Sequence, residues 1–276
     1  MPKPAIRPLR AMKEYRQCEE LQREVWGAYA VAAEVLSVTQ KNGGAVLGAM
    51  VGGKVVGFIY AFLARRQGRL LHWSHMMAVL PEFRDRGLGF QMKLAHRTLA
   101  ISQGIQSIGW TYDPLQSRNA TLNLQRLGAE VMEYIPNYYG QFPSRIEKGL
   151  PSDRFVVNWR IGAKKVENRL LGNHPSPAWK PAARINQTEI DPQGFLTNKR
   201  VYLNLNDLRL LLEIPPNTDA IREVSPQLGL EWRTATRKAF QHYLGAGYRV
   251  IGFYPPTRDS EGRCYYLLAR RRKAWE

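Results

Sequence analysis

Two arginines and two glycines are crowded into six positions in the first third of the chain. The segment PEFRDRGLGFQMKLAHRTLA holds Arg84, Arg86, Gly87 and Gly89 in its first half. Its second half has apolar residues at helical spacing, which predicts a helix from Gly87 to about Ser102. A helix start presents unpaired backbone N–H groups and the positive end of the helix dipole. Because glycines admit a ligand and arginines add donors, the segment predicts a site for a pyrophosphate or a similar anion.

Three phosphate-binding motifs compete for this segment. A Walker A loop requires a lysine directly after its glycines, and none follows here. A dinucleotide fingerprint requires a third glycine where Met92 stands, and it opens a β-α-β unit, whereas strands of antiparallel type are expected before this segment. The third motif is the Arg-x-x-Gly-x-Gly turn of the GNAT acyltransferases, which bind coenzyme A.

The chain resembles the GNAT acyltransferases most clearly along MMAVLPEFRDRGLGFQMKLA. This run has the apolar-Ala-Val end of a strand, then Pro-Glu-aromatic, then the arginine and glycine turn, then an amphipathic helix. The order of expected elements over about residues 5–162 is also similar, and WTYDPLQSRNATLNLQRLGA resembles a poorly characterised bacterial branch whose members carry a C-terminal extension. The resemblance implies an α+β fold of three layers, in which a GNAT core with a mixed, mostly antiparallel sheet is followed by a smaller α+β extension.

The resemblance also implies how coenzyme A would be held. The backbone of Met77 and Val79 would contact the pantetheine arm where the fourth strand splays from the fifth. The pyrophosphate would be held by the turn residues Arg84, Asp85, Arg86, Gly87, Leu88, Gly89 and Phe90. Asn119 and Asn123 lie four residues apart, on one face of an expected helix, and suit contacts to the pantetheine or the thioester. Capping or solvent exposure explains these two asparagines equally well.

Acyl transfer to an amine needs a base for the ammonium, donors for the tetrahedral oxyanion and an acid for the leaving thiolate. Many GNAT enzymes carry a glutamate on the fourth strand as the base, and His75 stands at the matching position. An imidazole titrates near neutrality, so His75 could serve. Strand alternation would put Trp73, His75, Met77 and Val79 on one face, toward the expected cleft. A structural histidine held by a hydrogen bond is the alternative.

Other residues are weaker candidates for proton transfer. Asp113 or Glu82 could relay a proton through water, although an aspartate before a proline often only caps a turn. The tyrosine that usually acts as the acid in GNAT enzymes would fall at Leu124, which cannot donate a proton. Tyr138 and Tyr139, expected on the next strand, are phenols that could replace it, or they could simply pack. The thiol of coenzyme A could also leave unassisted, since its pKa is like that of cysteine.

Strands and helices must position these candidates. The apolar pattern predicts a helix over 11–26, a hairpin turned at Gly52-Gly53, a strand over 70–79 and the helix behind the turn. A strand over 105–114, a helix over 117–129 and strands over 130–140 and 154–162 are expected to follow. Together, residues 1–163 form the expected GNAT acyltransferase core.

The rest of the chain is predicted to be a linker and a second unit. Residues 164–199 contain four prolines and few apolar runs, which indicates a helix stub plus a linker. Residues 200–276 form the expected C-terminal α+β extension, with a strand over 209–215 and two more over 248–256 and 263–271. Its helix has Ser225 as the N-cap, Pro226 at the first position and Gly245 at the end.

Composition limits the classes of partner. No apolar run is long enough to span a membrane and the first residues do not resemble a signal peptide, so a cytoplasmic protein without membrane contact is expected. Cys18 and Cys264 stand outside any metal-binding spacing, and no metal is expected. Forty Lys and Arg against 23 Asp and Glu give a net charge of +17. This charge is spread along the chain and not concentrated in one stripe, so it suits small polyanionic ligands as well as nucleic acid. Nucleic acid is not the expected partner.

Two hypotheses about function follow. The first is an N-acyltransferase that uses acetyl-CoA or succinyl-CoA to acylate a primary amine of a small molecule, possibly an amino acid, by direct attack in a ternary complex. The second is a non-catalytic module that binds acyl-CoA or nucleic acid, which the leucine at position 124 keeps open. A homodimer is left open under both hypotheses.

Overall fold

The computed structural model describes residues 3–140, 150–172, 182–258 and 260–270. Within these residues the chain forms two compact units. The first holds residues 3–110 and 158–167, and the second holds the other described residues. The boundary falls within three elements, β5 (Ser107–Tyr112), β7 (Arg154–Arg160) and α5 (Lys164–Leu170), so each of these contributes to both units.

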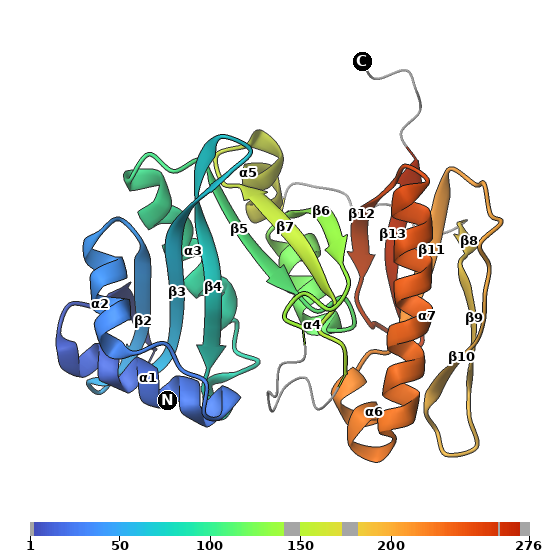
Figure 1. Cartoon of the computed structure of the whole chain (residues 1–276), viewed down its shortest axis with the longest axis horizontal. Helices are drawn as coiled ribbons and strands as arrows, with labels where there is room; N and C mark the ends of the chain where they lie inside the picture. The colour runs from blue at the N-terminus through green and yellow to red at the C-terminus, as the bar shows by residue number, and fades with distance from the viewer. Residues whose placement is uncertain (1–2, 141–149, 173–181, 259, 271–276) are drawn as a thin grey trace. The chain divides into compact units, whose positions relative to one another are not determined.

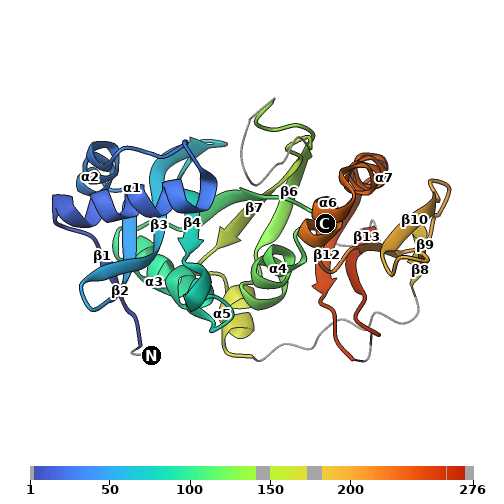
Figure 2. The same ribbon diagram turned by 90° about the horizontal axis from the view of Figure 1, so that it is seen from below.

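The first unit is a sheet with helices on both faces (Figure 1, Figure 2). Helices α1 and α2 cover one face, where Tyr15 and Leu36 pack with Phe58 of β3. Helix α3 covers the other face, where Met92 packs with Ile59 of β3. The elements that have not been given above are β1 (Ala5–Pro8), α1 (Met12–Trp26), α2 (Ala33–Lys41), β2 (Ala45–Val51), β3 (Lys54–Arg66), β4 (Arg69–Val79), the 3-10 turn η1 (Pro81–Phe83) and α3 (Leu88–Ser102).

The main sheet is mixed and mostly antiparallel, as expected. Its seven strands have the order β1-β2-β3-β4-β5-β7-β6, where β6 is Glu130–Ile135. Strands β1 to β4 pair antiparallel, whereas β4 and β5 pair in parallel. This arrangement confirms the expected fold class.

Strand β4 contains a bulge at His75. Opposite β3, Tyr60 pairs with Met76 and Ala61 pairs with Ser74, so His75 is an extra residue on β4. An extra residue reverses the alternation of side chains beyond it. The expected common face of Trp73, His75, Met77 and Val79 is therefore wrong. Met77 and Val79 pack with Leu88 and Met92 on the α3 side, while the His75 ring lies against aromatic rings of β3.

The second unit has its own sheet, with strand order β12-β13-β11-β8, and a separate β9-β10 hairpin. Helix α7 packs along the four-stranded sheet (Figure 1). Its Phe240 lies 4.7 Å from Phe155 of β7 and 5.4 Å from Tyr266 of β13 between ring centroids, so strands from both parts of the sequence share one aromatic core. The elements are α4 (Ser117–Ala120), the π-helical segment η2 (Thr121–Arg126), β8 (Ala183–Arg184), β9 (Asn186–Ile190), β10 (Leu196–Val201), β11 (Arg209–Ile214), α6 (Thr218–Val224), α7 (Pro226–Gly245), β12 (Tyr248–Tyr254) and β13 (Cys264–Arg270).

Most predicted elements are present, and the differences have simple causes. Ser225 caps α7, with its hydroxyl accepting from the Leu228 N–H at 3.2 Å, as the sequence predicts. The segment predicted as a linker begins with α5 and continues, after residues 173–181, which lie outside the described part, into β8, β9 and β10. The apolar pattern does not reveal those strands because they are short and largely polar. It does not reveal helix α2 either, because β-branched residues, including exposed Val35 and Val38, weaken the helical pattern.

The predicted domain limits, 1–163, 164–199 and 200–276, differ from the two compact units. Residues 111–140 and 150–157 belong with the C-terminal part, since the aromatic core and two ion pairs join them to α7. Among the described residues, no helix is both long and apolar enough to cross a membrane.

Candidate active site

The predicted anion turn joins β4 to α3. After η1, Asp85 and Gly87 adopt left-handed backbone conformations, with φ of +59° and +75°. Gly87 is the N-cap of α3, and the Gln91 N–H donates to the Gly87 carbonyl oxygen at 3.1 Å. The amides of Leu88 and Gly89 precede that bond. They therefore belong to the group of N–H donors that an α-helix cannot satisfy within its own first turn.

The turn combines these donors with positive charge. The side chains of Arg84, Asp85 and Arg86 are exposed, and the first turn of α3 contains no acidic residue. The Arg84 Nε donates to the Val79 carbonyl oxygen at 2.9 Å, which ties the turn to the end of β4. The positive end of the α3 helix dipole adds to the positive electrostatic potential of the turn. A diphosphate bound at the N-terminal end of α3 would meet backbone amides and guanidinium groups together.

The two glycines of the turn differ in what they require. Gly87 has a left-handed backbone, which a residue with a side chain adopts only at a cost. At Gly89, an added Cβ would lie 3.6 Å from the Met77 Cε, an ordinary contact. Packing within the chain therefore does not require glycine at position 89. The absence of a side chain there keeps the start of α3 open to a ligand, which fits a bound diphosphate.

Strands β4 and β5 are paired over a short length. Their parallel register consists of His72 with Ile108 and Trp73 with Gly109. From Ser74 to Val79, β4 has only β3 as a paired neighbour among the described residues. The Val79 carbonyl oxygen accepts from Arg84, but the backbone of Met77 has no strand partner on the other edge of β4 among the described residues, which suits the expected contacts with an extended pantetheine arm.

His75 lies at the bulge beside this edge. Its side chain is exposed, and its ring centroid lies 6.1 Å from those of both Tyr60 and Phe62. These neighbours desolvate the imidazole and lower the pKa of His75 below its ordinary value of 6.5. At pH 7 the ring is therefore neutral and can accept a proton.

A buried lysine next to this region is not predicted by the sequence pattern. Lys93 of α3 is 3% exposed, and its Nζ donates to the Ser74 hydroxyl at 3.0 Å and lies 3.9 Å from the centroid of the Trp110 ring. No ion pair joins Lys93 to a carboxylate in the described part of the chain, and burial lowers the pKa of Lys93 to about 7. The one signal in the sequence that could have revealed this buried lysine is its place in α3, since Lys93 lies next to Met92 on the side of the helix that faces the sheet.

Two histidines continue this buried polar cluster. The His72 Nδ1 lies 3.0 Å from the His96 Nε2, and the His72 Nε2 lies 3.0 Å from the Gly43 carbonyl oxygen. Because a carbonyl only accepts, the His72 Nε2 carries the proton and the His96 Nε2 donates to His72. Burial holds the pKa of both histidines below its ordinary value. The cluster fixes α3 to β4 through neutral groups.

Asp113 is engaged in an ion pair. Its two carboxylate oxygens accept from the guanidinium of Arg233 at 2.8 and 2.6 Å. Although burial opposes ionisation, the charge and hydrogen bonds of Arg233 lower the pKa of Asp113. One turn further along α7, Arg237 makes a similar pair with Asp153, which also accepts from the Tyr134 hydroxyl. The geometry gives Asp113 a structural partner, and the relay through it stays a prediction.

Tyr138 and Tyr139 lie in a turn after β6 and not on the strand itself, which corrects the expected position. Their rings are T-shaped at 4.8 Å, and the Arg154 guanidinium lies 5.2 Å from the Tyr139 centroid. The Tyr139 hydroxyl lies 3.5 Å from the Thr111 hydroxyl. Their role as the acid stays a prediction.

Asn119 and Asn123 have different surroundings. Asn119 is exposed, whereas Asn123 is 3% exposed. The expected shared face assumes an α-helix, but α4 becomes π-helical from Thr121, which changes the residues per turn. The described structure thus places His75, Met77, Val79 and the turn in the first unit, with Met77 and Val79 packed near Leu88 of the turn, while the two asparagines, Asp113 and the two tyrosines lie in the second unit.

A comparison with known families decides the class of this site. Residues 9–128 match the family model described as Acetyltransferase (GNAT) family. The chain carries a GNAT acetyltransferase domain. The matched part of this GNAT domain includes His75, the anion turn and Asn123, and it ends before Tyr138. The expected enzyme class, a GNAT-type acyltransferase, is confirmed by this match.

Solved structures of acetyltransferases are similar to the chain in fold. The putative acetyltransferase yncA from Salmonella typhimurium, solved with acetyl-CoA, is 16% identical with a TM-score of 0.48, over 64% of this chain and 99% of that one. The ribosomal-protein-S18-alanine N-acetyltransferase of Escherichia coli is 15% identical with a TM-score of 0.46, over 58% and 95%. An acetyltransferase of the GNAT family from Streptococcus pneumoniae is 17% identical with a TM-score of 0.45, over 56% and 98%. No curated protein matches the chain.

Proposed function

We propose that this chain transfers the acyl group of a coenzyme A thioester to a primary amine of a small molecule, such as an amino acid. The observation that carries the proposal is the positive, glycine-bearing start of α3 beside the unpaired edge of β4, within a GNAT domain. The thioester supplies the activated acyl group. The chain supplies binding, orientation and a base.

The turn would bind the diphosphate through the amides of Leu88 and Gly89 and through the side chains of Arg84 and Arg86. Asp85 and Phe90, the other residues of the predicted turn, would contribute through their backbone. The edge of β4 at Met77 and Val79 would hold the pantetheine arm in an extended form, because unpaired strand groups bind extended chains. Asn119 and Asn123 stay predicted contacts near the thioester.

His75 is the base that we propose for the amine. A neutral imidazole can remove a proton from the ammonium, and the bulge exposes His75 at the edge of β4 where the thioester would end. Attack is proposed to be direct, within a ternary complex. For the acid, Tyr138 and Tyr139 stay the candidates, beside unassisted departure of the thiolate.

The net charge of +17 supports a donor or an acceptor that bears a carboxylate. Succinyl-CoA is therefore proposed as a donor beside acetyl-CoA. The cytoplasmic location and a homodimer also stay predictions, which fractionation and light scattering would test.

Thiol release from acetyl-CoA and from succinyl-CoA, measured against a library of amino acids and polyamines, tests the proposal. We expect amine-dependent release with intersecting initial-velocity plots, which indicate a ternary complex. The Gly89→Trp variant should lose activity because its side chain would fill the space at the N-terminal end of α3, while the matched Gly89→Ala control should retain it. Release that needs no amine, or activity that survives Gly89→Trp, would contradict the proposal.

The role of His75 has its own test. The His75→Gln variant should lower kcat at least tenfold and leave KM for the thioester within about twofold, since general-base catalysis typically contributes about 10² to 10⁴. The rise of kcat with pH that marks ionisation of the base should disappear. If His75→Gln keeps the wild-type pH profile, then another group is the base.

A further inference from the structure

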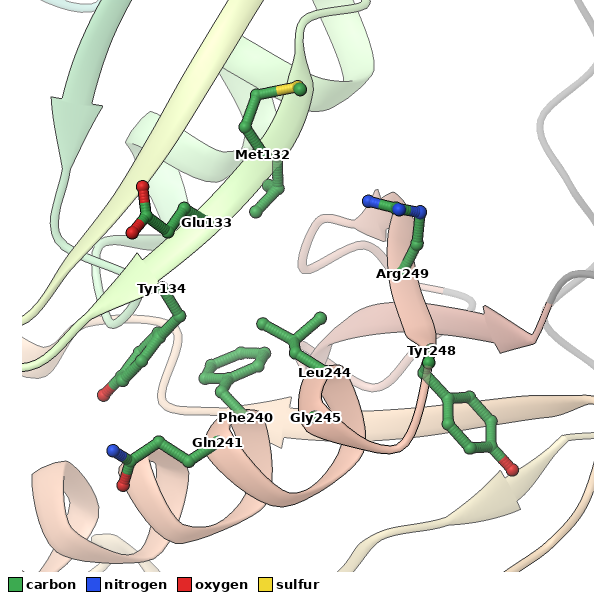
Figure 3. A pocket seen from close by; sticks show the side chains of 11 residues that line it. Met132, Glu133, Tyr134, Phe240, Gln241, Leu244, Gly245, Tyr248 and Arg249 are labelled. Atoms are coloured by element: carbon green, nitrogen blue, oxygen red, sulfur yellow. The ribbon is translucent and has the colours of Figure 1, made fainter.

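A pocket of about 430 Å³ lies within the second unit (Figure 3). It is lined by the edge strand β6, the C-terminal end of α7 and the start of β12. Its volume falls in the range of about 300 to 1,000 Å³ that is usual for small-molecule sites. It is made entirely of residues outside the first unit, where the anion turn and His75 lie.

The floor of the pocket is apolar, and hydrogen bonds fix the elements that form it. Phe240 and Leu244 of α7 form it, and the Tyr134 ring of β6 lies 5.5 Å from the Phe240 ring. The Tyr134 hydroxyl donates to Asp153, and Arg237 donates to the same carboxylate at 2.9 and 2.5 Å. These bonds tie β6 to α7, so the walls exist before a ligand binds. A preformed pocket avoids the entropic cost of ordering its walls on binding.

Arg249 places a positive charge at the pocket. Its side chain is exposed and, among the described residues, makes no hydrogen bond, ion pair or ring contact. Figure 3 shows it at one side of the pocket, opposite Glu133, with the guanidinium extending toward the side of Met132. A guanidinium binds a carboxylate with two parallel hydrogen bonds. Glu133 and the C-terminal end of α7, at Gly245, are negative, which disfavours a second negative charge on the ligand.

We propose that this pocket binds a small monocarboxylate with an apolar or aromatic body. The carboxylate pairs with Arg249, and the body lies on Phe240 and Leu244. The inference is independent of the proposed acyl transfer, because none of its residues belongs to the anion turn or to β4.

Calorimetry on the full chain tests this with three probes of one shape, namely 3-phenylpropionate, 3-phenylpropanol and 3-phenylpropylamine. We expect the carboxylate to bind at least tenfold more tightly than the alcohol, and the amine to bind most weakly. Arg249→Gln should remove the preference for the carboxylate, and Leu244→Trp should abolish binding of all three. Arg258→Gln, which changes another exposed arginine of the same unit, is the matched control and should change nothing.

The proposal fails if 3-phenylpropionate does not bind the wild type at millimolar concentration, or if the alcohol or the amine binds as tightly. It also fails if Arg249→Gln keeps the preference for the carboxylate. Because Arg249 is exposed, this variant is expected to fold, and its circular dichroism spectrum checks that it does.

Discussion

Replacing Lys93 by methionine should stabilise the protein at pH 7 and not at pH 10. Burial lowers the pKa of Lys93 from 10.5 to about 7, and each pKa unit corresponds to about 1.4 kcal/mol. Because the folded-state pKa is the lower one, the unfolded chain binds more protons between pH 7 and 10.5. The wild type therefore gains stability as the pH rises through this range. The cost of burying the amine is about 4 kcal/mol at pH 7 and about 1 kcal/mol at pH 10.

Methionine has a similar shape and no charge, so it removes this cost. It also loses the hydrogen bond to Ser74 and the N–H···π contact of the amine with the Trp110 ring, worth about 1 kcal/mol each. Lys93→Met should then raise the free energy of unfolding by about 2 kcal/mol at pH 7 and lower it by about 1 kcal/mol at pH 10. The difference of about 3 kcal/mol between the two pH values comes from titration alone.

Urea unfolding of the wild type and the variant at pH 7, 8, 9 and 10 measures this difference. Lys54→Met, which changes an exposed lysine of β3, is the matched control and should show a nearly constant effect across the series. Parallel curves for the wild type and Lys93→Met would refute the argument, because they would mean that the buried amine keeps an ordinary pKa.

Three further predictions concern stability. Arg233→Met should lower the free energy of unfolding by about 3 to 5 kcal/mol, because it leaves the Asp113 carboxylate without its partner. Denaturant melts measure this loss, and the double variant Asp113→Asn, Arg233→Met should recover much of it. Gly87→Ala should cost about 1 to 2 kcal/mol in thermal melts because of its φ of +75°, and an equal stability of Gly89→Ala and Gly87→Ala would contradict the role given to that backbone. Arg7 and two backbone amides lower the pKa of Glu14 from 4.5 to about 2. The stability that these contacts give to the folded protein is therefore complete above pH 4.5 and is lost as the pH falls through 2. Glu14→Gln should then cost about 2 to 3 kcal/mol at pH 7 and little at pH 2, and an equal cost at both would rule out this account.

Local signals in the sequence are sufficient for the elements around the turn. Gly52 and Gly53 turn the hairpin and Ser225 caps α7, as predicted, and α3 begins one residue after the predicted Gly87, which is its N-cap. Each of these depends on residues within one turn of the chain, where backbone preference and side-chain capping dominate.

The bulge at His75 could not be predicted in this way. Alternation assumes one residue on β4 for each residue on β3, and the extra residue appears only when the two strands are paired. The sequence does carry a histidine where the family usually has a base, so the position can be found from the sequence while its face cannot.

Contacts between distant residues are also beyond the sequence. Asp113 and Arg233 are separated by 120 positions, and Asp113 has the pattern of a turn cap because a proline follows it. Lys93 has the pattern of a polar residue in an amphipathic helix, and only the packing of α3 on β4 buries it. In both cases the tertiary fold supplies the partner that determines the chemistry.

Calorimetric titration of the wild type with coenzyme A and with pantetheine, which lacks the diphosphate, tests the central claim most directly. If the diphosphate docks at the amides and guanidinium groups at the start of α3, then coenzyme A binds at least tenfold more tightly than pantetheine, and Gly89→Trp removes that difference while Gly89→Ala keeps it. Equal affinity for the two ligands, or an unchanged preference for coenzyme A in Gly89→Trp, would contradict the account.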